Sequence, residues 1–213
     1  MNSDHKARVD PAVRRRGAPP AGRRLNRQAV VDRAHDQISR DGHAGFSLRA
    51  LAGELGVRPA ALYNHVRDRD DLLDAVAERF VETFELPAGD ASWPDWVRQV
   101  ARRLRGHMRA HPHLTMLVLA RRAAGPARPA LLRAFMTRLE RCGVHPATAH
   151  AGWHAVLRLV VGSVSEDVVR GQDGHDAFEA TLELVTGGLE LAAGRPPDVR
   201  FVTLLHAHPD ARS

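Results

Sequence analysis

The chain has 213 residues, of which 44% are hydrophobic and 26% are charged, a balance typical of a globular protein with a buried core. No apolar run is long enough to span a membrane and no secretory leader is recognisable, so we expect a cytoplasmic protein that does not contact a membrane. The one cysteine, Cys142, excludes an intramolecular disulfide framework.

The net charge of +6 is unevenly distributed along the chain. Residues 1–24 contain seven basic and two acidic residues and are rich in Pro, Gly, Ala and Arg, with no apolar period. This composition predicts a disordered basic arm, which is either a solvated leader or a segment that contacts DNA phosphates or the minor groove. Residues 25–86 carry eight arginines and eleven carboxylates, a net charge of −3. The predicted folded head is therefore not expected to bind nucleic acid strongly by net charge alone.

The first folded segment is predicted to be a helix that begins after Asn26 and ends before Gly42. Two shorter helices follow at about residues 47–66. Gly56 separates them, and Pro59 stands where a first-turn proline begins a helix. The first of the two has an apolar face at i, i+3, i+4 and i+7, made by Leu48, Leu51, Ala52 and Leu55.

The second short helix has an outward surface that mixes hydrogen-bond donors, small side chains and one aromatic ring. These residues are Arg58, Ala60, Ala61, Tyr63, Asn64 and His65. Such a surface can read base edges in the major groove of DNA, whereas an ordinary helical hairpin is the alternative interpretation of the fragment.

A longer helix is predicted next, from an N-cap at Asp68 to a break at Pro87. Its apolar residues keep the helical period through Phe84, so it would connect the hairpin to the remainder of the chain.

Residues 25–80 contain five landmarks in order and without a gap: LNR, the DG before the first hinge, LRALAGELGV, ALYNHV and DLLDAV. In these landmarks the segment closely resembles the N-terminal DNA-binding domain of the TetR family of transcriptional regulators, and its tetracycline-repressor branch most. The resemblance implies an all-α fold, with a three-helix helix-turn-helix head over residues 25–86. It also implies a larger helical domain for effector binding and dimerisation over 87–195, followed by a tail over 196–213.

The resemblance also assigns roles to single residues of the head. Arg49 matches a family arginine that reaches DNA, and Arg69 replaces a lysine that holds backbone phosphate. Tyr63 and His65 match positions that touch phosphate and bases. Four residues differ from the tetracycline-repressor pattern, so we expect a different operator sequence; they are Pro59, Ala60, Ala61 and Asn64.

Beyond Pro87 the apolar spacing predicts helices that surround a cavity. In the resembling family this domain holds an effector pocket, for which we predict a small, mostly apolar ligand. The amphipathic side chains expected near it are Trp96, His107, Met116, Phe135, Trp153 and His154. Plain core packing is the alternative for each.

Histidine pairs at i, i+4 spacing, such as His107 with His111, raise the question of a metal site. No such pair has a third ligand whose position the sequence fixes, so we predict neither a metal nor a cofactor. The tetracycline branch holds drug-bound magnesium with a helix-end histidine, which the matching segment LARRAAGPARP lacks. Tetracycline is therefore not the expected ligand.

The last two predicted helices, 147–170 and 176–193, are apolar on two sides, which indicates two packing partners. A four-helix interface with a second copy satisfies this pattern and is also what the resemblance implies. The residues assigned to this homodimer interface are Val160, Val164, Leu182, Val185 and Leu189.

No catalytic motif is recognisable in the sequence, so an enzyme is not expected. The sequence favours a dimeric repressor that binds a palindromic operator in double-stranded DNA and is released by an effector. A regulator controlled by a protein partner, and a helical enzyme or metal-binding protein, remain the alternatives.

Overall fold

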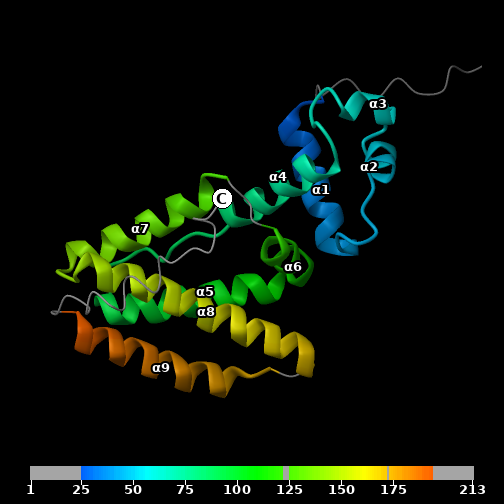
Figure 1. Cartoon of the computed structure of the whole chain (residues 1–213). Coiled ribbons are helices and arrows are strands. Elements are labelled where there is room, and N and C mark those ends of the chain that lie inside the picture. The colour runs from blue at the N-terminus through cyan, green and yellow to red at the C-terminus, as the bar shows by residue number, and fades with distance from the viewer. Residues whose placement is uncertain (1–24, 122–124, 172, 194–213) are drawn as a thin grey trace, which may run out of the picture.

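The computed structural model describes residues 25–121, 125–171 and 173–193, and all regular structure in these ranges is helical (Figure 1). The all-α prediction is confirmed. The basic arm and the C-terminal tail lie outside the described residues. The helices are α1 (Arg27–Asp41), α2 (Leu48–Glu54), α3 (Pro59–Leu62), α4 (Arg69–Glu82), α5 (Trp93–Ala110), α6 (Pro112–Ala120), α7 (Ala127–Arg141), α8 (Pro146–Arg170) and α9 (His175–Ala192). None of the described helices combines the length and apolar character needed to cross a membrane.

Side-chain caps fix where the helices of the head begin. The Asn26 carboxamide oxygen accepts from the backbone N–H of Ala29 at 2.8 Å, which starts α1 as predicted. The Asp68 carboxylate accepts from the backbone N–H of Asp71 at 2.7 Å and starts α4 in the same way. Gly56 has φ +67°, a left-handed conformation that favours glycine, and it turns the chain between α2 and α3.

Two hydrophobic cores divide the described part of the chain. The first contains the buried faces of α1, α2, α3 and α4, and Figure 1 shows these helices grouped at one end of the molecule. It also contains Leu114 and Leu117 from α6, which are 0% and 1% exposed. Helix α6 therefore packs on the head, although it follows the expected domain boundary by more than twenty residues.

The second core lies between α5, α7, α8 and α9. Four residues that we had assigned to a dimer interface lie in it, namely Val160, Val164, Leu182 and Leu189, and Val185 packs against its edge. The four buried side chains are occupied by the protein's own core and are not available to a second copy, whereas Val185 is only partly buried. The assignment of the buried residues to the dimer interface is therefore corrected. It failed because a heptad-like seam has the same spacing whether it packs within one chain or between two.

A buried ion network joins α5 to the turn between α8 and α9. The Arg105 guanidinium is almost fully buried and donates to the Asp167 and Asp173 carboxylates at 2.7 and 2.8 Å. It also donates to the Ser163 hydroxyl at 2.8 Å and lies over the Phe178 ring. Five donors of a planar guanidinium can satisfy several partners at once, so one residue holds three helices together.

We expect Arg105→Ala to lower the free energy of unfolding by about 3 kcal/mol, because it leaves the Asp167 carboxylate buried without its closest partner. Urea unfolding at pH 7, followed by circular dichroism, measures this loss. Arg102→Ala is the matched control, since Arg102 pairs with Glu179 at the surface and its removal should cost less than about 1 kcal/mol. Equal losses in the two variants would contradict a special role for the buried network.

Candidate nucleic-acid interface and apolar pocket

The α2–α3 hairpin exposes polar side chains to solvent and buries apolar ones. Leu62 and Val66 turn inward and are 0% and 2% exposed, whereas Tyr63 is 58% exposed although it is aromatic. The predicted DNA-contacting residues Arg49, Arg58, Ala60 and Asn64 are exposed, and Ala61 and His65 are half-buried. The structure therefore leaves these predicted residues wholly or partly accessible to solvent, on or beside α2 and α3. Their contacts with DNA remain a prediction.

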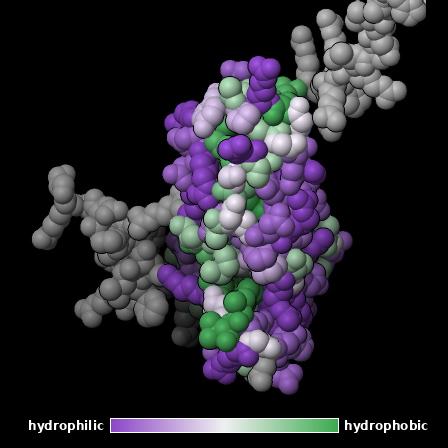
Figure 2. Space-filling view, turned by 90° about the vertical axis from the view of Figure 1, so that its right-hand side faces the viewer, coloured by the Kyte–Doolittle hydropathy of each residue, from purple (hydrophilic) through white to green (hydrophobic). Residues whose placement is uncertain are grey.

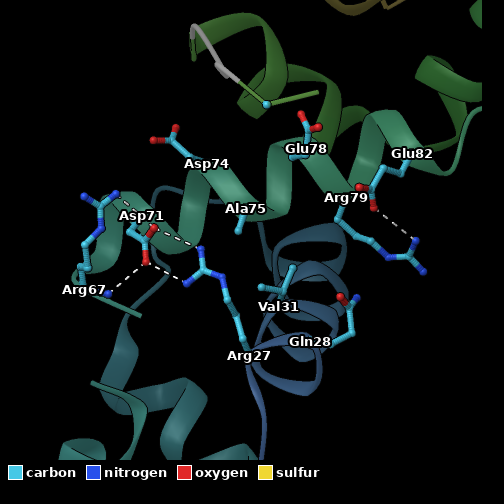
Figure 3. Close-up of a pocket in the computed structure, with 11 residues that line it drawn as sticks. Arg27, Gln28, Val31, Arg67, Asp71, Asp74, Ala75, Glu78, Arg79 and Glu82 are labelled. Carbon is cyan, nitrogen blue, oxygen red and sulfur yellow. Dashed lines mark hydrogen bonds and ion pairs between the residues drawn. The ribbon is translucent and has the colours of Figure 1, made fainter. Parts of the chain in front are cut away.

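The orientation of this surface depends on Arg27, which the sequence analysis did not single out. Its guanidinium donates to both oxygens of the Asp71 carboxylate at 3.0 and 3.1 Å (Figure 3). It also donates to the backbone carbonyl of His65 at 2.8 Å. Asp71 also accepts from the backbone N–H of Arg67 at 3.0 Å. One arginine at the start of α1 thus holds the end of the recognition segment against the start of α4.

These contacts stabilise the ionised form of Asp71. The hydrogen bond from Arg27 is the largest cause, followed by that from the Arg67 backbone, and together they hold the pKa of the Asp71 carboxyl far below its usual range. Asp71 is the third residue of α4, where a capping box would place its side chain on the backbone N–H of Asp68. Its side chain instead reaches back to Arg67, one residue before the cap.

Arg69 has a different contact from the one expected. Its guanidinium donates to the backbone carbonyls of His43 at 2.8 Å and Phe46 at 3.2 Å, so it ties the α1–α2 loop to α4. The neighbouring acids do not crowd it, because Asp70 pairs with Arg121 and Asp71 with Arg27. The Arg69 guanidinium has further N–H groups that do not donate to His43 or Phe46. Their contact with a DNA phosphate remains a prediction.

A mostly apolar pocket of about 450 Å³ lies where the two cores meet. Helices α4, α5, α6, α7 and α8 all contribute to its wall. The lining residues are Phe80, Val81, Phe84, Leu104, His107, Met108, Val118, Leu119, Arg128, Pro129, Leu131, Leu132, Trp153, Leu157 and Val161. Its size falls in the range of about 300–1,000 Å³ that is typical of small-molecule sites.

Two of the six predicted pocket residues, His107 and Trp153, line this cavity. Trp96 does not, because its indole N–H donates to the backbone carbonyl of Pro87 at 2.8 Å. Phe135 is fully buried in the core between the rings of Trp96 and Trp153. Met116 is 49% exposed.

His154 is also absent from the lining residues. The sequence could not separate it from Trp153, because the two residues are adjacent in the chain. Leu157 and Arg128 line the pocket and were not predicted to do so from the sequence. The i, i+4 spacing of Leu157 from Trp153 was the available signal. Nothing in the sequence marked Arg128.

His107 is one of two lining residues with polar side chains. Its ring stacks on Phe80 with 4.5 Å between ring centroids and lies at an angle to Phe84 at 5.6 Å. Burial lowers the pKa of His107, against an opposing hydrogen bond to the backbone of Phe80, so the imidazole is neutral at pH 7. Its Nε2 atom is buried, and no described residue gives it a hydrogen-bond partner.

Carboxylates on one side of α4 connect the head to the pocket wall. Arg121, at the end of α6, donates to the Asp74 and Asp70 carboxylates at 2.5 and 3.2 Å. The Glu78 carboxylate accepts from the backbone N–H of Ala127 at 2.5 Å, at the first residue of α7. In Figure 3, Asp74 and Glu78 point away from α1 and toward the segment before α7. Both α6 and α7 contribute to the pocket, so its wall is attached directly to α4.

A second cavity, of about 610 Å³, lies beside α1 and α4 (Figure 3). It is lined by charged side chains of both signs, among them the Arg27–Asp71 pair. Neither here nor elsewhere in the described ranges do three potential metal ligands come together. The His107–His111 pair, whose rings are 5.5 Å apart, therefore has no third ligand among these residues.

Comparison with known proteins identifies the family. Residues 30–76 match the model of bacterial regulatory proteins of the tetR family, and residues 86–173 match the tetracyclin repressor-like C-terminal domain. The tetracycline repressor protein class A from transposon 1721 of Escherichia coli is 34% identical over 186 residues, which cover 84% of this chain and 86% of the relative. The chain belongs to the TetR family of transcriptional regulators.

Two solved structures of this family show the classes of molecule that its members bind. The TetR family protein ActR of Streptomyces coelicolor, in complex with actinorhodin, is 25% identical with a TM-score of 0.71, covering 81% of this chain and all of that chain. BioQ with its double-stranded DNA operator is 28% identical with a TM-score of 0.64, covering 78% and 98%. Structures similar to this TetR-family protein have thus been solved in complex with operator DNA and with actinorhodin.

We expect Asp71→Asn to lower the free energy of unfolding by about 1–3 kcal/mol at pH 7, because Arg27 and Arg67 lose a charged acceptor. The pKa of this carboxyl is lowered in the folded state. Its contribution is therefore fully present above the ordinary pKa of 3.8 and is lost as the pH falls further.

Urea unfolding at pH values from 7 to 3 should show the difference between Asp71→Asn and the wild type shrinking below about pH 4. Asp41→Asn is the control, since Asp41 is exposed and lies 3.8 Å from Arg40. A constant difference across the pH range would contradict the proposed role of the Asp71 charge.

Proposed function

We propose that this protein is a transcriptional repressor that binds a palindromic operator as a two-fold dimer and is released by a small, mostly apolar effector. The observation that carries the proposal is that α4 begins beside the recognition hairpin and its distal residues, Phe80 and Val81, line the pocket. We assign the DNA-binding head to residues 25–86 and the effector and dimerisation domain to 87–195. Such a protein acts in the cytoplasm, where the operator is accessible.

The exposed hairpin supports sequence-specific binding. Arg49 at the start of α2 and the α3 surface offer guanidinium, amide, imidazole and phenol groups that can reach base edges or phosphates. Two such heads related by a two-fold axis meet successive major grooves about 34–36 Å apart, which requires a palindromic site.

We expect Arg49→Ala to weaken binding to the cognate operator by about 1–3 kcal/mol and to relax base preference at one position. In vitro selection from random duplexes, followed by fluorescence anisotropy at fixed salt, measures both effects. Arg103→Ala removes an exposed arginine of α5 and serves as the control. Unchanged affinity and unchanged preference would remove Arg49 from the reading surface.

The outer faces of α8 and α9 support the dimer. On α9, five exposed residues alternate at spacings of four and three, and Leu184 and Leu191 among them are 78% and 85% exposed. The five are Ala177, Thr181, Leu184, Gly188 and Leu191. On α8, Val168 and Val169 near its C-terminal end are 58% and 85% exposed.

Apolar side chains this exposed indicate a surface that another protein covers. Figure 2 shows a largely hydrophilic side of the molecule whose strongest hydrophobic patch lies near its lower end, at the level of the C-terminal end of α8. A four-helix contact between α8 and α9 of two copies would cover the exposed face of α9, with the small residues allowing close approach.

We expect the double variant Leu184→Glu, Leu191→Glu to be a folded monomer, because both side chains lie outside the core and the new carboxylates repel across a two-fold axis. Analytical ultracentrifugation measures the mass. Met116→Glu places the same charge on an exposed apolar position of α6 and should leave the dimer intact. A dimer that persists in the double variant would contradict this interface.

The contacts around α4 support release by an effector. A ligand that alters the position of α6 or α7 acts on α4 through Arg121 and Glu78, and α4 is joined to the recognition segment through Asp71 and Arg27. A ligand changes operator affinity only through a difference in its affinity for the two arrangements of the heads. A coupling free energy of about 1–3 kcal/mol corresponds to a loss of about 5- to 150-fold.

A compound that binds in the pocket should lower the affinity of the protein for operator DNA by some factor. We expect operator DNA to lower the affinity for that compound by the same factor. Fluorescence of Trp153, which lines the pocket, follows titrations of such a compound with and without operator. In Arg121→Ala the compound should still bind, but its effect on operator affinity should be smaller. The variant lacks the ion pairs of Arg121 with Asp70 and Asp74 that join α6 to α4. Equal affinities for the compound with and without operator in the wild type would contradict regulation through this pocket.

A further inference from the structure

The apolar pocket contains one positive charge that no described carboxylate neutralises. Of the side chains that line it, those of His107 and Arg128 are polar and the others are apolar or aromatic. Among the described residues, no aspartate or glutamate lines it. Arg121, a few residues before Arg128, pairs with two carboxylates, whereas Arg128 forms no ion pair within the described ranges.

Backbone contacts hold the Arg128 side chain at the pocket wall. Its guanidinium donates to the backbone carbonyl of Val118 at 2.7 Å, which uses one of its five N–H donors. Arg128 is the second residue of α7, so the positive end of the helix dipole adds to its charge. The Glu78 carboxylate accepts from the backbone N–H of Ala127, the residue before Arg128, and lines the neighbouring polar cavity instead of the pocket.

The rest of the wall selects for a ring system. Phe80, Phe84 and Trp153 contribute aromatic side chains, and most of the remaining lining residues are leucine, valine and methionine. Flat apolar molecules gain both area burial and ring stacking in such a site. The buried Nε2 of His107 adds one position for a polar substituent.

We propose that the effector is an aromatic anion, with its rings between Phe80, Phe84 and Trp153 and its carboxylate or equivalent acidic oxygen group bound by Arg128. This inference rests on the proposed function, because it names the ligand class of the same site. A guanidinium in a low-dielectric wall binds a carboxylate through charge-assisted, bidentate hydrogen bonds, which a neutral amide cannot replace.

A matched pair of probes tests the charge requirement in the full-length chain without DNA. The probes are anthracene-9-carboxylate and anthracene-9-carboxamide, which share the ring system and differ in charge. Isothermal titration calorimetry at pH 7 should show the carboxylate binding at least about 10-fold more tightly than the carboxamide.

Two arginine variants on α7 locate the effect. Arg128→Gln should abolish the preference, because it should lower the affinity for the carboxylate probe and leave the affinity for the carboxamide probe unchanged. Arg133→Gln removes an exposed arginine that does not line the pocket, and it should keep the wild-type preference. Circular dichroism and urea unfolding confirm that both variants fold. Leu157→Trp, which fills the pocket from α8, should weaken both probes.

The proposal is overturned if neither probe binds, if both bind equally to the wild type, or if Arg128→Gln keeps the preference. It is also overturned if Leu157→Trp leaves binding unchanged, because the probes then sit elsewhere. Binding of the carboxylate through Arg128 with no effect on operator affinity would support the ligand class and contradict regulation. The two proposals therefore fail separately.

Discussion

Helix α4 belongs to both halves of the molecule, and most of the functional geometry depends on this sharing. One side of α4 supplies Leu73, Val76 and Phe80 to the core of the head. Phe84, just beyond its end, is buried in the core of the body. Because the interior is closely packed, a helix in this position cannot move at one end without displacing neighbours at the other. Helix α4 thus connects the recognition hairpin at one end to the pocket at the other.

The carboxylates of the head are mostly engaged in internal contacts, which explains how a segment of net charge −3 can face DNA. Asp71 is bound by Arg27, Asp70 and Asp74 by Arg121, and Glu54 by Arg33 and Arg40. Each pair compensates a negative charge locally, so the potential at the hairpin depends more on the nearby exposed arginines than on the sum over the segment. The same ion pairs fix the angle of α3 and the attachment of α6. Charge compensation and positioning of the reading surface are consequently performed by the same residues.

Helix α6 shows where local sequence stops being informative. Its apolar spacing predicted a helix correctly, and its position after Pro87 favoured the second domain, yet Leu114 and Leu117 pack in the head. An amphipathic stripe specifies that a face is buried and not which surface buries it. The same limit explains the dimer assignment, because both faces of α9 carry helical apolar spacing and only packing against α5 and α8 shows that Leu182 is internal and Leu184 external. The pocket is affected too, since Phe135 and Trp153 are neighbouring core aromatics and one of them lines the cavity.

The sequence by itself determined the all-α class, the residues at which the helices of the head begin and the turn between α2 and α3, because these follow from interactions between residues a few positions apart. Asn26, Ser47 and Asp68 cap helices from the adjacent turn, and the left-handed conformation of Gly56 sets the hinge. The tertiary structure alone decided the contacts of Arg27 with Asp71 and of Arg121 with Asp70 and Asp74, which join residues 44 to 51 positions apart. It also decided which ring systems enclose the pocket and that Arg128 lies in its wall. Such contacts depend on the relative placement of whole helices, which is set by packing of the complete cores and is not encoded in any local spacing.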